Sequence, residues 1–123
     1  MPSYSLHVES EFSAAHQLRE YRGHCENLHG HNWRVRLTVS GETLSPLGLL
    51  MDFADLKALL NKMLARLDHR FLNEISPFDE INPTVENLSR YIAESLTPQM
   101  PGGVGVEAVT VWESEKCSAT WRI

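Results

Sequence analysis

Residues 31–41 read HNWRVRLTVSG, and the alternation of apolar and polar side chains in this stretch predicts a strand with one buried face. A second alternating stretch begins at Tyr4 and continues to Ala14, which predicts a partner strand. The period changes after Phe53, where apolar side chains recur every three or four residues. This spacing predicts an amphipathic helix of about four turns, with Asp52 as its N-cap.

A second helix is expected after the residues NPT at 82–84, where Thr84 can cap an apolar stripe that ends before Pro98. Residues 106–114 and 117–123 alternate again and are separated by a short turn, which predicts a hairpin. The order ββααββ indicates an α+β domain with a four-stranded antiparallel sheet and two helices on one face. Because such a sheet leaves two edges open, we expect an oligomer.

The composition is that of an average soluble protein. The chain has 123 residues, of which 42% are hydrophobic and 22% charged, so we expect a single domain over residues 1–123. No stretch approaches the length of a membrane helix, and we expect a cytoplasmic protein that does not bind membranes. The net charge of −5 argues against nucleic acid as a partner. Both cysteines, Cys25 and Cys117, are expected to be reduced.

Three histidines share a face of the two predicted N-terminal strands. His29 and His31 are two residues apart, so their side chains emerge on the same side of a strand. Extending the phase of the first strand brings His16 to that side as well. A His-x-His pair alone is more often no metal site, but three imidazoles with an open fourth position are typical of catalytic zinc.

Candidate proton-transfer groups lie outside this cluster. Cys25 precedes the paired histidines in a loop, where a nearby cation would favour its thiolate, although a lone cysteine is more often a small buried hydrophobe. Asp68 and His69 end the first predicted helix, where the alternative interpretation is a surface carboxylate followed by a histidine that the helix dipole stabilises. Glu113 is in phase with Val111 on an apolar face, where a ligand with several N–H groups would satisfy the carboxylate.

The segments FSAAH, CENLHGHNW, LDHRFLN, NPTVENL and VWES together resemble the 6-pyruvoyl-tetrahydropterin synthase family. They are most similar to its bacterial branch, the 6-carboxy-tetrahydropterin synthases of queuosine biosynthesis. The resemblance covers nearly the whole chain. It implies the tunnelling fold, in which subunits join their sheets into a β-barrel and two rings stack into a homohexamer with active sites at subunit interfaces.

The resemblance also implies roles for individual residues. The zinc ligands of the family match His16, His29 and His31, and its catalytic cysteine matches Cys25. The other matches lie in the second half of the chain: the Asp–His pair, supplied by a neighbouring subunit, is Asp68 and His69, the pterin-anchoring glutamate is Glu113, and a pterin-contacting position is Thr84.

The implied activity is that of a zinc-dependent lyase. Its substrate would be 7,8-dihydroneopterin triphosphate, and its products 6-carboxy-5,6,7,8-tetrahydropterin, acetaldehyde and triphosphate. In another branch a glutamate three residues before the His-Gly-His replaces the cysteine as base and releases 6-hydroxymethyl-7,8-dihydropterin for folate synthesis. Glu26 occupies that position, so this second product, or both activities, stays open. A 6-pyruvoyl-tetrahydropterin synthase is a less favoured alternative, and a zinc-binding scaffold without chemistry is the competing hypothesis from another class.

Overall fold

The strand β2 (His29–Gly41) lies at the centre of the sheet in the computed structural model, which describes residues 2–123. It pairs antiparallel with β1 (Tyr4–His16) on one side and with β4 (Gly105–Ser114) on the other. The last strand, β5 (Cys117–Arg122), pairs antiparallel with β4. The predicted C-terminal hairpin is therefore confirmed.

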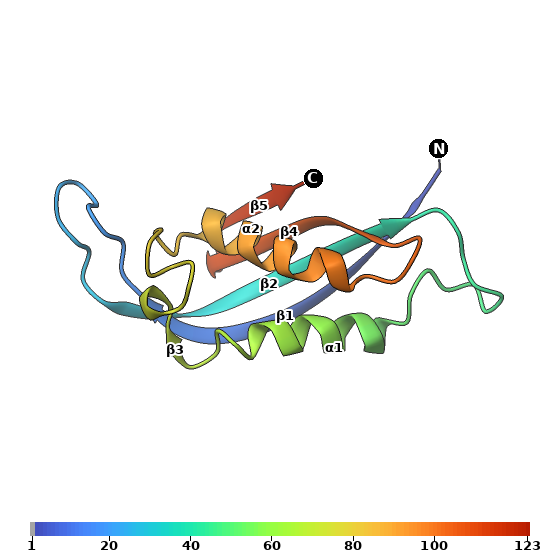
Figure 1. Ribbon diagram of the computed structural model, residues 1–123, viewed down its shortest axis with the longest axis horizontal. Helices are drawn as coiled ribbons and strands as arrows, with labels where there is room; N and C mark the ends of the chain where they lie inside the picture. Colours follow the sequence, from blue (N-terminus) through green and yellow to red (C-terminus); the bar gives the residue numbers. More distant parts are fainter. Residues whose placement is uncertain (1) are drawn as a thin grey trace.

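Both helices lie on one face of the sheet, with α1 (Phe53–Leu64) along β1 and α2 (Val85–Leu96) against β4 (Figure 1). The predicted N-caps are confirmed, because Asp52 accepts a hydrogen bond from the backbone of α1 and Thr84 from that of α2. The first helix ends sooner than its apolar pattern predicts. Leu67 continues that pattern and is buried, but it lies beyond the last helical turn.

The four predicted strands are present and pair antiparallel, but the prediction missed a fifth strand, because the described residues form a five-stranded mixed sheet in the order β3-β1-β2-β4-β5. The added strand is β3 (Arg70–Phe71), which runs parallel to β1 beside Ala14 and Ala15. A strand of two residues is too short to show an alternating pattern, so the sequence does not predict it. Short 3₁₀ turns follow β3 and α2, at Leu72–Glu74 and Thr97–Gln99.

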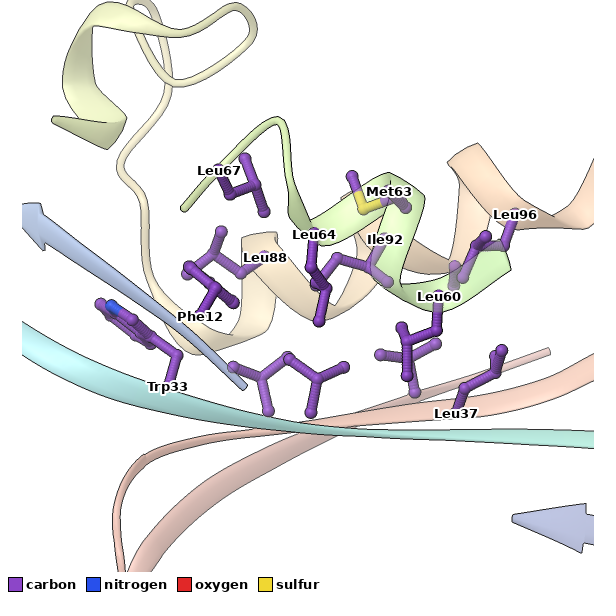
Figure 2. Packing of buried hydrophobic residues seen from close by; sticks show 14 of the residues in the cluster. Phe12, Trp33, Leu37, Leu60, Met63, Leu64, Leu67, Leu88, Ile92 and Leu96 are labelled. Carbon is purple, nitrogen blue, oxygen red and sulfur yellow. The ribbon is translucent and has the colours of Figure 1, made fainter. Parts of the chain in front are cut away.

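The core lies between the sheet and the helices (Figure 2). Phe12 of β1 stacks on Trp33 of β2, with the ring centroids 5.9 Å apart. The indole N–H of Trp33 donates to the Ala14 carbonyl at 3.1 Å, so this fully buried side chain leaves no polar atom unpaired. The alternation therefore places Phe12 and Trp33 on the buried face as predicted, with the exceptions that Tyr4 of the apolar phase is exposed and Thr38 of the polar phase is buried.

The sheet keeps two free edges. The strand β5 ends one side, and on the other side β1 carries β3 beside only Ala14 and Ala15. The side chain of Lys57 donates to the Glu9 carbonyl on this edge of β1 and covers part of it. Within residues 2–123, no helix has both the length and the apolar content needed to cross a membrane. The oligomeric barrel stays a prediction.

Candidate metal centre

Strand pairing brings the three predicted ligands together at one end of the sheet. His16 is paired directly with His29, and His31 follows two residues later on the same strand, opposite Ala14. Side chains two residues apart in a strand share a face, so all three imidazoles project to the side that carries the helices. They lie over Trp33, whose ring centroid is 4.7 Å from that of His16 and 5.1 Å from that of His31.

The imidazole nitrogens converge with a carboxylate. The Nε2 atoms of His16 and His29 are 3.0 Å apart, and the Nε2 atom of His31 is 3.5 Å from Oε1 of Glu113. One donor atom from each of these four residues lies within 4.8 Å of the others. Glu113 comes from β4, at the point where the β4–β5 register shifts. The sequence predicted the three histidines, and the structure adds Glu113 beside them.

Backbone carbonyls hold two of the rings from behind. The Nδ1 atom of His16 is 2.8 Å from the Pro83 carbonyl oxygen, and Nδ1 of His29 is 2.8 Å from that of Asn27. Each carbonyl requires the proton on Nδ1, which leaves the Nε2 lone pair facing the cluster. Burial lowers the pKa of His16 below its ordinary value of 6.5, although the bond to Pro83 opposes this. The neutral imidazole that results is the form that binds metal.

These residues fit a divalent cation. The Nε2 atom of His31 is buried and has no hydrogen-bond partner among residues 2–123, and two further Nε2 lone pairs face each other beside it. A cation would satisfy all three nitrogens at once. Three imidazoles and one carboxylate oxygen are a donor set that zinc accepts, although imidazole also suits other transition metals.

The two candidate bases, Cys25 and Glu26, have different surroundings. Cys25 is a free, exposed thiol outside the group of metal-binding atoms. The carboxylate of Glu26 accepts from the Leu18 N–H at 3.2 Å, and the Glu26 N–H donates to the Leu18 carbonyl at 2.8 Å. Its Oε1 atom is 3.9 Å from Nδ1 of His29, the nitrogen that faces away from His16. Glu26 is therefore tied to the loop behind the metal cluster.

The side chains of Asp68 and His69 contact each other just before β3. Oδ2 of Asp68 is 2.9 Å from Nδ1 of His69, and Oδ1 accepts from the Ser13 N–H at 2.8 Å. His69 has a φ of 58° and an exposed ring, and its own N–H donates to the Ser13 carbonyl. One surface pocket of about 510 Å³ has both His31 and His69 in its lining. That the pair serves a neighbouring subunit stays a prediction.

The Asp68 carboxylate makes the stability of this region depend on pH. The Ser13 N–H, together with His69, lowers the pKa of Asp68 below its ordinary value of 3.8. A lowered pKa in the folded state stabilises the fold above the ordinary value, and this stabilisation is lost as the pH falls through the folded-state pKa. We expect Asp68→Asn to lower the Tm near pH 7 and this difference to shrink below about pH 4. Thermal unfolding across that range measures it, and a Tm difference that is constant with pH would contradict the expectation.

Thr84 caps α2, because its hydroxyl accepts from the Asn87 N–H at 3.1 Å. The hydroxyl proton stays available to donate, so the predicted pterin contact is compatible with capping. We expect Thr84→Ala to lower the free energy of unfolding by about 1 kcal/mol, whereas Thr84→Ser retains the cap. Denaturant unfolding of both variants measures this. Equal unfolding free energies for the alanine variant and the parent would show that the cap contributes nothing.

Sequence reasoning missed the groups that orient the ligands. The carbonyls of Pro83 and Asn27 act through the backbone, which leaves no signal in residue type. It also missed the side chains that fix the segment just after His16. Asn73 and Asn82 bond to the backbone of this segment, and the guanidinium of Arg19 attaches it to Phe78. For Asn82, the one sequence feature that could have indicated a role is its position directly before Pro83 in the segment NPT.

Comparison with known proteins agrees with this geometry. The pattern of the family described as 6-pyruvoyl tetrahydropterin synthase matches residues 5–123. Among curated relatives, the dihydroneopterin monophosphate aldolase of Pyrococcus furiosus is 35% identical, with 87% of each chain covered. The 6-carboxy-5,6,7,8-tetrahydropterin synthase of Synechocystis is 36% identical and covers 95% of this chain and 90% of its own.

A solved structure supports the same assignment. The 6-pyruvoyl tetrahydropterin synthase of Caenorhabditis elegans superposes with a TM-score of 0.85 at 27% identity, over 100% of this chain and 97% of its own. Sequence, fold and the grouped histidines therefore agree, and the chain belongs to the 6-pyruvoyl tetrahydropterin synthase family.

Proposed function

We propose that the protein is a zinc-dependent carbon–carbon lyase that acts on 7,8-dihydroneopterin triphosphate. The proposed products are 6-carboxy-5,6,7,8-tetrahydropterin, acetaldehyde and triphosphate, with one water consumed, and the proposed place is the queuosine pathway in the cytoplasm. The observation that carries the proposal is the convergence of three imidazole Nε2 atoms beside an acidic side chain, one of these atoms being buried with no hydrogen-bond partner among the described residues. Cys25, in the loop that precedes β2, adds an exposed thiol.

Glu113 is the proposed anchor of the pterin ring. A carboxylate can accept two parallel hydrogen bonds from the amino group and a ring N–H of a pterin, as it does from a guanidinium. Because Oε1 of Glu113 lies 3.5 Å from Nε2 of His31, a ring held in this way is brought against the metal-binding imidazoles. The hydroxyl of Thr84 is the second proposed contact.

His16, His29 and His31 would hold the zinc ion, which would supply Lewis acidity toward the side-chain hydroxyls of the substrate. Cys25 is the proposed base that removes a proton from this side chain. His69 is the proposed second proton carrier. Asp68 holds the Nδ1 side of the His69 ring, so Nε2 is the nitrogen that can exchange a proton with the substrate.

The surroundings of the two candidate bases favour the carboxy product. The Glu26 carboxylate is held by the Leu18 N–H, whereas the Cys25 thiol is exposed. We therefore assign the leading role to Cys25. Release of 6-hydroxymethyl-7,8-dihydropterin by Glu26 is the second candidate, and the aldolase name of the Pyrococcus furiosus relative is the observation that favours it. The 6-pyruvoyl product ranks third.

Product analysis tests the proposal. The purified, zinc-loaded protein is incubated with dihydroneopterin triphosphate, and the pterins are separated by chromatography. We expect 6-carboxy-tetrahydropterin as the main product. A predominance of 6-hydroxymethyl-dihydropterin would transfer the base role to Glu26. If none of the three candidate pterin products forms although zinc binds, the protein is a metal-binding scaffold and the proposed function is wrong.

We further propose that the protein forms a homo-oligomer, a hexamer in which active sites lie at subunit interfaces. The support is the pair of free sheet edges at β1 and β5, which present unpaired backbone groups to another subunit. Light scattering coupled to gel filtration measures the mass of the assembly. A monomer at micromolar concentration would exclude this part of the proposal.

A further inference from the structure

The chain just after His16 has left the sheet, yet side chains still pair its backbone. The Oδ1 atom of Asn73 accepts from the Gln17 N–H at 3.0 Å, and its Nδ2 donates to the Gln17 carbonyl at 2.8 Å. Asn82 does the same for Arg19, at 2.8 Å from the N–H and 3.1 Å to the carbonyl. Each carboxamide thus replaces one residue of a neighbouring strand.

The other side of this short segment is paired in the same way. The Leu18 N–H and carbonyl both bond to Glu26, through its carboxylate and its backbone N–H respectively. Residues 17–19 are therefore bonded on both sides, although they belong to no strand. Since Cys25 is the residue before Glu26, the position of the thiol depends on this pairing.

The guanidinium of Arg19 adds a second attachment. It donates to the carbonyls of Phe78 at 2.6 Å, Asn73 at 3.2 Å and Ile81 at 3.2 Å. Three backbone acceptors around one guanidinium satisfy most of its donors and hold residues 73–82 against the start of the loop.

Asn82 and Pro83 connect this loop to the metal cluster. The Asn82 side chain holds Arg19, while the carbonyl of the next residue, Pro83, is the partner of His16 Nδ1. The Asn82 carbonyl accepts from the Asn87 side chain at 2.8 Å, which fixes the pair to α2. Two consecutive residues therefore set the orientation of a metal ligand and the place of the loop that carries Cys25.

We propose that Asn82 is a positioning residue that fixes the Cys25 loop relative to the metal ligand His16. Its role in turnover rests on the proposed function, whereas its role in metal binding and in thiol placement does not. Asn82 itself touches neither metal nor substrate in this proposal. It acts through Arg19 and through the Pro83 carbonyl.

The test uses three variants of the full chain, each carrying Cys117→Ser so that Cys25 is the one remaining thiol. Asn82→Ala removes both hydrogen bonds between this side chain and the Arg19 backbone. Asn82→Asp has the same shape and keeps the acceptor for the Arg19 N–H, but it loses the donor. The control is Asn61→Ala, which removes a carboxamide that also holds β1, through the Ser10 hydroxyl at 2.5 Å, away from the loop.

Two measurements need no turnover. In a Co²⁺ titration followed by the visible spectrum, we expect Asn82→Ala to weaken metal binding about tenfold, the lower range for loss of an outer partner of a ligand. We also expect the alkylation rate of Cys25 in metal-loaded Asn82→Ala to differ at least about threefold from that of the parent, because the released loop samples other positions. Asn82→Asp keeps the side-chain volume, and we expect its metal affinity and its Cys25 alkylation rate to lie between those of Asn82→Ala and the parent.

Turnover supplies a third measurement. If the enzyme acts on dihydroneopterin triphosphate, Asn82→Ala should lower kcat by about 100-fold with little change in KM, since a misplaced base slows chemistry more than binding. If both Asn82 variants have the same metal affinity and the same Cys25 alkylation rate as the control Asn61→Ala, the positioning role is wrong. Absence of turnover in the parent would overturn the proposed function and leave the first two measurements to decide the role of Asn82.

Discussion

Replacement of Cys25 by alanine is expected to lower kcat on dihydroneopterin triphosphate by about 100-fold to 10,000-fold, the usual contribution of a positioned general base. The metal content should stay at one ion per chain, because Cys25 lies outside the group of His16, His29, His31 and Glu113. Single-turnover kinetics and metal analysis of the same preparation measure both quantities. A joint loss of turnover and metal would instead show that the thiol takes part in metal binding.

The matched control is Glu26→Gln, in the same loop. A glutamine oxygen can still accept from the Leu18 N–H, so the loop should keep its place while the charge is removed. We expect this variant to retain most of the carboxy-tetrahydropterin activity. If Glu26→Gln loses as much kcat as Cys25→Ala, Glu26 is a second proton carrier. If Glu26→Gln alone loses activity, the proposed role of Cys25 is wrong.

Replacement of His31 by alanine is expected to weaken zinc binding by more than about 100-fold, beyond the usual effect of losing an outer partner of a ligand. The Nε2 atom of His31 is buried beside the Glu113 carboxylate, and no other described residue hydrogen-bonds to it. A bound ion stabilises the folded state according to its affinity, so added zinc should raise the Tm of the parent and leave that of the variant almost unchanged. Competition with a chromophoric chelator gives the dissociation constants.

Two further variants make this measurement specific. His7→Ala removes an exposed imidazole whose Nδ1 contacts the Thr38 hydroxyl at 2.9 Å, and it should leave the zinc affinity unchanged. Glu113→Gln separates two roles of that carboxylate. A loss of pterin binding with intact zinc affinity supports the anchoring role, whereas a loss of zinc affinity makes Glu113 a fourth ligand. Equal zinc affinity in His31→Ala and the parent would contradict the metal site described here.

Strand phase predicted most of the candidate metal site. His16 was assigned from the alternation of a strand whose recognisable apolar pattern ended at Ala14, and β1 does continue to His16 opposite His29. This succeeds because a strand fixes side-chain direction with a period of two, whatever its neighbours are. The same property placed Glu113 on the buried side of β4.

Contacts between distant segments were beyond such reasoning. The closeness of Glu113 to His31 depends on β4 pairing with β2, with Trp112 opposite Arg34, and the register of that pairing is not written in either strand alone. The strand β3 exists because Asp68 and His69 bond to the backbone of Ser13. Loop contacts, such as that between Glu26 and Leu18, could not be predicted either, because a loop has no repeating pattern that fixes the direction of its side chains.

The pairing of His16 with His29 also bears on how such an enzyme can diversify. Inserting one residue inside β1 or β2 would turn the following imidazole to the opposite face of the sheet and destroy the site. The connection between the two strands has no such constraint at its tip, so residues there can be exchanged or added while the metal stays in place. Residues at the tip can therefore vary among relatives without rebuilding the two strands that carry the three histidines.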